Sequence, residues 1–322
     1  MNRSLIQHTS PRKRSAAMTM NETRTPPIAS AAIQKAEERL QTLLPSIYRD
    51  RTDEVQPVSM GSAPLAFDVD GNVAWDRIWG SFCDLAMAGG PPHKGKLLEP
   101  GTPEQILAEP IRYAEVCDEI VRGIELAARL KATPSSSPGW MRVQCSNHTM
   151  VEWLLRAITM ENISVRLEEG AILLPAGPAF RVEKEIKNVI TVTAKTTHYW
   201  CSHLIRLQQL GVANLFYQLD SEAPLLQPAW EAGAEVANAR ERIERSLEDA
   251  TGLRTKKNSY ANWIGLDCES VSSAITTMRR LVASNILCRR EETAIFLPLN
   301  PVADPYGARL AHLVSELLAR DA

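Results

Sequence analysis

Hydrophobic and polar residues alternate in two short stretches of the chain, 141–145 and 264–268. In the first stretch, Met141, Val143 and Cys145 alternate with an arginine and a glutamine. Alternation with a period of two predicts a half-buried strand. Each stretch is followed by a segment that is expected to form a helix and then by two hydrophobic runs joined at a polar turn, which predict a β-hairpin. We therefore expect the order strand, helix, strand, strand to occur twice.

Other segments repeat hydrophobic residues every three or four positions, which is the pattern of an amphipathic helix. These segments cover residues 74–88, 109–131, 183–210, 231–251 and 304–320. Asn162 and Asn285 are expected to end the two helices that precede the hairpins, because asparagine can adopt the left-handed conformation found at helix C-termini.

The two parts of the chain also agree residue by residue. When residues 140–178 are set over 263–301, 13 of the 39 positions are identical without a gap. Chance would give about two or three identities, so this number of identities at a constant offset indicates an internal repeat. The sequence predicts an α+β fold, built by tandem duplication of a helix-helix-β-α-β-β unit. Two such units are expected to pack as an intramolecular pseudo-dimer.

This pattern predicts a chain in five parts. They are a disordered basic tail (1–30), an N-terminal helix with an extended segment (31–66), repeat unit 1 (67–178), repeat unit 2 (188–301) and a C-terminal helix (304–320).

Composition narrows the class of protein. The 322 residues are 44% hydrophobic and 23% charged, which is typical of a globular chain and excludes a largely disordered one. The formal net charge is −2, so bulk charge does not favour binding to nucleic acid. No apolar run approaches the roughly 18 residues of a membrane span. Six dispersed cysteines without a CxxC pair, and the lack of a secretory signal pattern, predict a cytoplasmic protein.

The first candidate site is the loop Gly89-Gly90-Pro91-Pro92-His93-Lys94-Gly95. Glycine and proline together impose an unusual backbone path, and the loop displays a histidine and a lysine within it. We interpret it as a substrate- or anion-binding loop, in which Lys94 supplies charge and His93 transfers a proton. A solvated turn between two helices is the alternative.

The second candidate site lies in the segment 195–203. In a regular helix Lys195, His198, Tyr199 and Ser202 share one face, which could line a pocket, whereas His198 and His203 are about 140° apart. A helix with ordinary packing is the alternative. No short spacing of histidine or cysteine predicts a metal site, and no motif indicates a cofactor.

These features favour an enzyme that acts on a small anionic metabolite or cofactor precursor in a cleft between the two units. His93 and His198 would be catalytic, and the substrate-binding residues would be Gly90, Lys94, Gly95, Lys195 and Tyr199. The reaction type and the substrate are not predicted.

Two alternatives stay open. One is a non-enzymatic accessory protein that acts through a protein partner or as a homo-oligomer. The other is a DNA-binding regulator, because a helix followed by a hairpin with Arg289-Arg290 resembles the end of a winged helix. A winged helix has two helices before its hairpin, whereas here a strand directly precedes a single helix, and the low net charge also argues against nucleic acid.

Overall fold

The computed structural model describes residues 30–48, 64–77, 84–230, 234–257 and 260–319. It contains helices and two four-stranded antiparallel sheets, which confirms the predicted α+β class. The predicted basic tail lies outside the described residues apart from Ser30, as does part of the extended segment before residue 64. No helix in the described ranges is long and apolar enough to cross a membrane.

The first sheet has the strand order β1-β2-β4-β3, with one helix between β2 and β3. Its elements are β1 (Ala132–Pro134), β2 (Trp140–Gln144), α4 (His148–Met160), β3 (Arg166–Glu168) and β4 (Ala171–Pro175). The predicted strand, helix and hairpin are thus confirmed here. The preceding chain joins this sheet through a parallel bridge between Leu98 and Ile163, and we call residues 98–178 the first half.

The second sheet has the matching order β5-β6-β8-β7. Its elements are β5 (Thr255–Lys256), β6 (Trp263–Asp267), α8 (Val271–Val282), β7 (Arg289–Glu291) and β8 (Ala294–Pro298). Leu226 joins this sheet through a parallel bridge to Ile286, and we call residues 226–301 the second half. The register also matches, because Trp140 pairs with Pro175 in the first sheet and Trp263 pairs with Pro298 in the second.

Side chains at the helix ends explain why α4 and α8 form where they do. Asn147 and Ser270 each accept a hydrogen bond from a backbone N–H in the first turn, which is the usual N-cap arrangement. Asn162 and Asn285 have φ values of 63° and 64°, so both adopt the expected left-handed conformation just after the helix.

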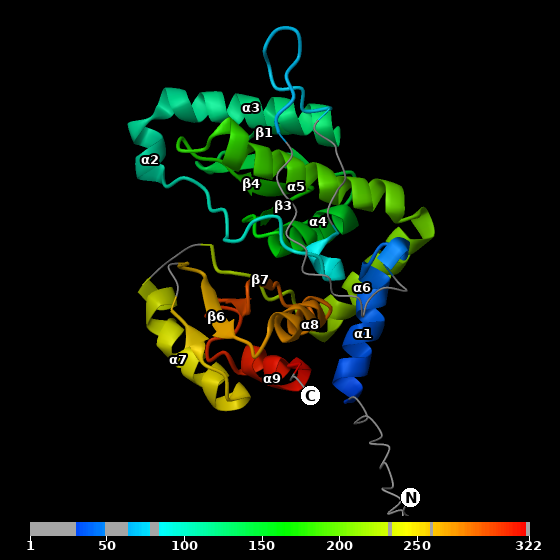
Figure 1. The fold of residues 1–322 in the computed structure, drawn as a ribbon. Coiled ribbons are helices and arrows are strands. Elements are labelled where there is room, and N and C mark those ends of the chain that lie inside the picture. Colours follow the sequence, from blue (N-terminus) through cyan, green and yellow to red (C-terminus); the bar gives the residue numbers. More distant parts are fainter. Residues whose placement is uncertain (1–29, 49–63, 78–83, 231–233, 258–259, 320–322) are drawn as a thin grey trace, which may run out of the picture.

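The remaining helices pack against the two sheets or against one another (Figure 1). Helix α3 (Pro110–Ala128) of the first half packs against α5 (Lys187–His198), which follows that half in the chain, and α2 (Pro103–Ala108) precedes α3. Helix α7 (Ala234–Thr251) of the second half packs against α9 (Ala308–Leu317), which follows that half in the chain. Helix α1 (Ala31–Leu43) contacts α6 (Arg206–Glu222), α8 and α9, and short 3₁₀ turns lie at Ser46–Tyr48 and Ala86–Ala88.

Two helix predictions differ from the structure. The predicted helix over 183–210 ends in a π-helical turn at Tyr199–His203, and α6 begins after a break at Leu204, which is extended and buried. The break contains no glycine or proline, and the hydrophobic pattern that predicted a single helix continues through it. The predicted helix over 74–88 lies partly outside the described residues, and only the 3₁₀ turn is seen in the rest.

Candidate functional site

Helix α5 carries an unusual number of polar side chains into the protein interior. Lys187, Thr193, Lys195, Thr196 and Thr197 are all buried. The helix is also flanked by two π-helical turns, η3 (Val182–Ile186) and η4 (Tyr199–His203). Because π-helical turns are rare and frequently occur at functional sites, α5 is the element most favoured to carry a functional site.

The centre of this region is a buried ion pair between Glu161 and Lys195. Glu161 follows α4, its Oε1 lies 2.7 Å from Nζ of Lys195, and the side chains are 0% and 1% exposed. The same carboxylate accepts hydrogen bonds from the backbone N–H of Ala86 (3.0 Å) and of His93 (2.8 Å). Its buried charge is therefore compensated by Lys195, by two backbone donors and by the nearby charge of Arg290, and it ties the segment 86–93 to α5.

Two glycines give this segment its path. Gly89 has φ 102°, and a Cβ on Gly90 would lie 2.5 Å from the carbonyl oxygen of Asp84. Gly95 is different, because nothing lies within 4 Å of the position its Cβ would occupy. Gly90 therefore acts through backbone packing, whereas Gly95 leaves open space beside Lys94.

The imidazole of His93 is half-buried and hydrogen-bonded to the side chain of Asn188 on α5. The pKa of His93 is lowered from 6.5 to about 4, first by burial and then by the positive charge of Lys195, while Glu161 and the Asn188 hydrogen bond act in the opposite direction. At neutral pH the ring is therefore uncharged and can accept a proton.

The loop also lies at the boundary between the two halves. The side-chain amide of Asn162 donates to the carbonyl oxygens of Lys94 (2.7 Å) and Arg290 (2.8 Å). Leu97 donates its backbone N–H to a carboxylate oxygen of Glu291 at 3.1 Å. Lys94 is half-exposed, and burial of part of its side chain lowers its pKa. The backbone of Lys94 thus lies where both halves meet, and the charge of its side chain interacts with Glu185 and Lys184.

Tyr199 is buried and linked to the start of the same segment. Its hydroxyl lies 2.6 Å from that of Tyr48, which is in turn 3.1 Å from a carboxylate oxygen of Asp84. Burial, together with the hydrogen bond to Tyr199, raises the pKa of Tyr48. Tyr199 therefore contributes to holding the segment against α5.

The histidines at the end of α5 lie closer together than a regular helix allows. The ring nitrogens Nε2 of His198 and His203 are 3.2 Å apart. The π-helical turn produces this contact, because its wider turn brings residues five apart onto one face. The expectation that they point in different directions was wrong for this reason. Within the described ranges no three His, Cys, Asp or Glu side chains gather as a metal site.

The predicted residues thus fall into two groups. His93, Lys94 and Lys195 contact Glu161 and Gly90 lies in the same segment, whereas His198 is exposed and packs on His203. Sequence reasoning missed Glu161 and Asn188. Glu161 could have been found, because the matching position in the second copy is a serine. A residue that only one copy carries is a candidate for a function that the two copies do not share.

Comparison with known proteins adds no family assignment. No protein-family model matches the chain, and no curated protein or solved structure gives a match.

Proposed function

We propose that the protein is an enzyme that acts on a small anionic metabolite or cofactor precursor at the boundary between its two halves, where His93 transfers the proton. The observation that supports this most is the Glu161–Lys195 pair, which fixes the backbone of His93 beside a buried positive charge. A neutral imidazole held in one position is available to accept a proton as a general base.

Each neighbour has a distinct part in this proposal. Lys94 binds the anionic group of the substrate, with Gly95 leaving space beside it. Lys195 is engaged by Glu161 and is a positioning residue rather than a substrate ligand. Gly90 and Tyr199 shape the segment that carries His93. His198 lies apart with His203 and is not assigned a step in the reaction.

The proposal includes a tandem duplication with the two halves packed as an intramolecular pseudo-dimer. Matching strand order, register and helix-ending asparagines support it. Each helix-ending asparagine also accepts a hydrogen bond from an arginine of the other half, Asn162 from Arg289 and Asn285 from Arg156, although these arginines do not occupy matching positions. A cytoplasmic location is part of the proposal and suits the free thiols of the described cysteines (Cys117, Cys145, Cys201, Cys268 and Cys288).

The test is a turnover assay on purified protein with a mixture of cellular phosphorylated and carboxylated metabolites, followed by mass spectrometry. Wild type should consume at least one anionic compound. His93→Gln keeps the backbone N–H that Glu161 accepts but removes the proton acceptor, so kcat should fall by about 10²–10⁴-fold. Lys96→Gln, a change at an exposed position of the same loop, is the matched control. Consumption of nothing, or equal rates for wild type and His93→Gln, contradicts the proposal.

The pH dependence of stability offers an independent check on His93. The unfolded chain takes up a proton near pH 6.5, whereas the folded chain does so only near 4. The unfolded state therefore binds more protons between these values, and the free energy of unfolding should fall as pH is lowered from about 6.5 to about 4. Urea denaturation of wild type and His93→Gln at several pH values isolates this contribution as a difference. A difference that does not vary with pH would show that His93 titrates normally.

One observation favours the non-enzymatic alternative. Helix α6 exposes Leu207, Leu210 and Tyr217 to solvent, and exposed apolar groups of this kind occur where proteins bind each other. Stable association through α6, abolished by Leu207→Ser with Tyr217→Ser, together with no turnover in the assay above, would favour an accessory protein. The winged-helix alternative gains no support, because a single helix separates the second and third strands of each sheet in the described chain.

A further inference from the structure

Helix α6 turns a face of hydrophobic side chains towards solvent. On this face Leu207, Leu210 and Tyr217 are 74%, 54% and 80% exposed, and Asn214 between them is also exposed. The opposite face is buried where α6 contacts α1 and α4 (Figure 1). Three large hydrophobic side chains gathered on one helix face are typical of a surface that binds another protein. We call these four residues the α6 stripe.

The residues of the α6 stripe follow the spacing of a helix that packs lengthwise on a second helix. They are three, four and three positions apart, which is the repeat of the inner positions of a coiled coil. Asn214 occupies one of these positions, and an asparagine at such a position specifies the register and number of the paired helices. The stripe therefore favours a helix as its partner.

Charge narrows the choice of partner helix. Residues 207–219 contain no charged side chain, although 23% of the chain is charged. Solvent-facing helix surfaces usually carry charged residues, so this face is composed like a contact surface. Arg206 and Asp220 stand directly before and after the uncharged run. A strongly charged partner would have nothing to pair with along the stripe, whereas a second copy of α6 offers the same uncharged surface.

The α6 stripe is complementary to itself when the second helix runs antiparallel. A two-fold axis at the level of Val212 places Leu207 level with Tyr217 of the second copy. The same axis places Leu210 level with Asn214 of the second copy. Every position of the stripe therefore meets a position of the stripe on the other copy, and the contact uses the same surface on both molecules.

The charged residues at the two ends of the run favour the antiparallel direction. Arg206 and Asp220 are two heptads apart and therefore lie on the same flank of the stripe. In an antiparallel pair each Arg206 comes close to Asp220 of the second copy, whereas a parallel pair brings the like ends together. Asp220 is exposed, and its Oδ1 accepts a hydrogen bond of 2.9 Å from the Asn285 side chain, which holds the carboxylate on this flank. Opposite charges thus meet at both ends of the antiparallel pair.

We propose that the protein forms a homodimer in which the α6 stripes of two copies pack antiparallel about a two-fold axis. An ion pair between Arg206 of one copy and Asp220 of the other closes the contact at each end. An interface built around one helix of each copy is at the small end of specific interfaces, so the dimer should dissociate on dilution. The stripe contains no residue of the proposed active site, and the dimer does not depend on the proposed enzyme activity.

The test is sedimentation-velocity ultracentrifugation of the full chain at about 1 to 100 μM. The mass should rise with concentration from that of the 35.7 kDa monomer towards twice that value. Leu210→Glu places a carboxylate in the apolar centre of the contact on both copies, so the dissociation constant should rise at least about tenfold. Leu107→Glu, at a leucine of α2 that is 80% exposed, is the matched control and should associate as wild type does.

Charge reversal at the two ends tests the direction of the helices. Arg206→Glu brings two carboxylates together and Asp220→Lys brings two cations together, so each variant alone should associate at least about threefold more weakly. An equimolar mixture of the two restores opposite charges at both ends and should associate as tightly as wild type, with circular dichroism confirming that both variants are folded. A wild type that stays monomeric overturns the proposal and leaves the stripe to a different protein. Equal association of wild type and Leu210→Glu, weakened association of Leu107→Glu, or a mixture that gains nothing over either variant also overturns it.

Discussion

Replacing Lys195 by Met is expected to lower the free energy of unfolding by about 3–5 kcal/mol. The substitution leaves the Glu161 carboxylate fully buried and without its hydrogen-bonded cation, so that the two backbone donors of Ala86 and His93 and the nearby charge of Arg290 remain. Urea denaturation of the full chain measures the loss. The folded fraction of the variant should also show weaker protection of the His93 amide against hydrogen exchange.

The control is an ion pair of the same kind at the surface. Arg245 and Glu241 lie 3.4 Å apart on α7 and are 73% and 83% exposed. Arg245→Met should change the free energy of unfolding by less than about 1 kcal/mol, because water screens an exposed pair. Similar losses for both variants would show that burial of the Glu161–Lys195 pair does not matter.

Gly90→Ala is expected to destabilise the protein by about 1–3 kcal/mol and to displace the segment that carries His93. The new Cβ would lie 2.5 Å from the carbonyl oxygen of Asp84 and 2.8 Å from its carbonyl carbon, so backbone has to move. Hydrogen exchange at the amides of Ala86 and His93 reports the displacement directly, since both donate to Glu161.

Gly95→Ala is the matched control in the same loop. Nothing lies within 4 Å of its added Cβ, so its stability and exchange rates should stay close to those of wild type, within about 0.5 kcal/mol. Equal effects of the two substitutions would mean that the loss of glycine's conformational freedom causes them, and not the close approach of Gly90 to the backbone of Asp84.

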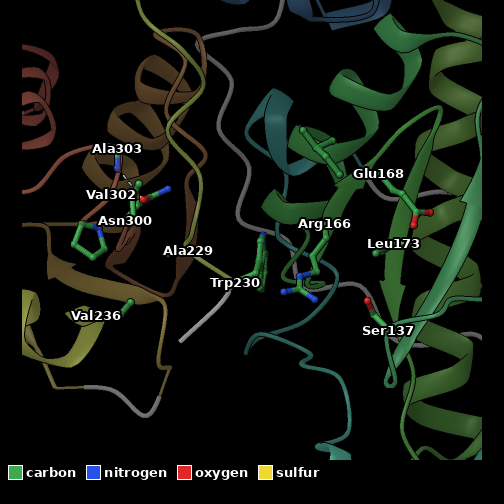
Figure 2. Close-up of a pocket in the computed structure, with 12 residues that line it drawn as sticks. Ser137, Arg166, Glu168, Leu173, Ala229, Trp230, Val236, Asn300, Val302 and Ala303 are labelled. Atoms are coloured by element: carbon green, nitrogen blue, oxygen red, sulfur yellow. Dashed lines mark hydrogen bonds between the residues drawn. The ribbon is translucent and has the colours of Figure 1, made fainter. Parts of the chain in front are cut away.

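The proposed active site lies where the two halves of the chain differ. Glu161, which ties the His93 loop to α5, has a serine at its matching position. Ser137 and Leu173, which line a cavity of about 760 Å³ (Figure 2), have aromatic residues at theirs. We infer that the shared residues build the two sheets, whereas the differing residues provide the chemistry.

Local pattern was enough to predict much of each sheet. Alternation placed β2 and β6 within one residue of their bounds, and the asparagines marked the ends of α4 and α8. These features depend on interactions between residues close in sequence, such as a helix cap or a hairpin turn, so a short window contains the information. The strands β1 and β5 were missed because three and two residues are too short to show a period.

Other features depended on contacts between distant segments. The break at Leu204 and the π-helical turn before it carry no local marker, and burial of Leu204 accompanies them. The pairing of His198 with His203 follows from that turn. A regular helical repeat therefore gave the wrong relation between the two rings.

By itself, the sequence determined the strand and hairpin order of both sheets and the loop in which His93 and Lys94 lie, because side-chain periodicity and glycine or proline geometry are local properties. Only the tertiary structure decided that Glu161 and Lys195 form a buried pair behind that loop. It also decided that Arg166 lines a cavity while Arg289 is enclosed. The physical reason is that burial, charge compensation and empty volume are set by residues far apart in the chain, which no local pattern brings together.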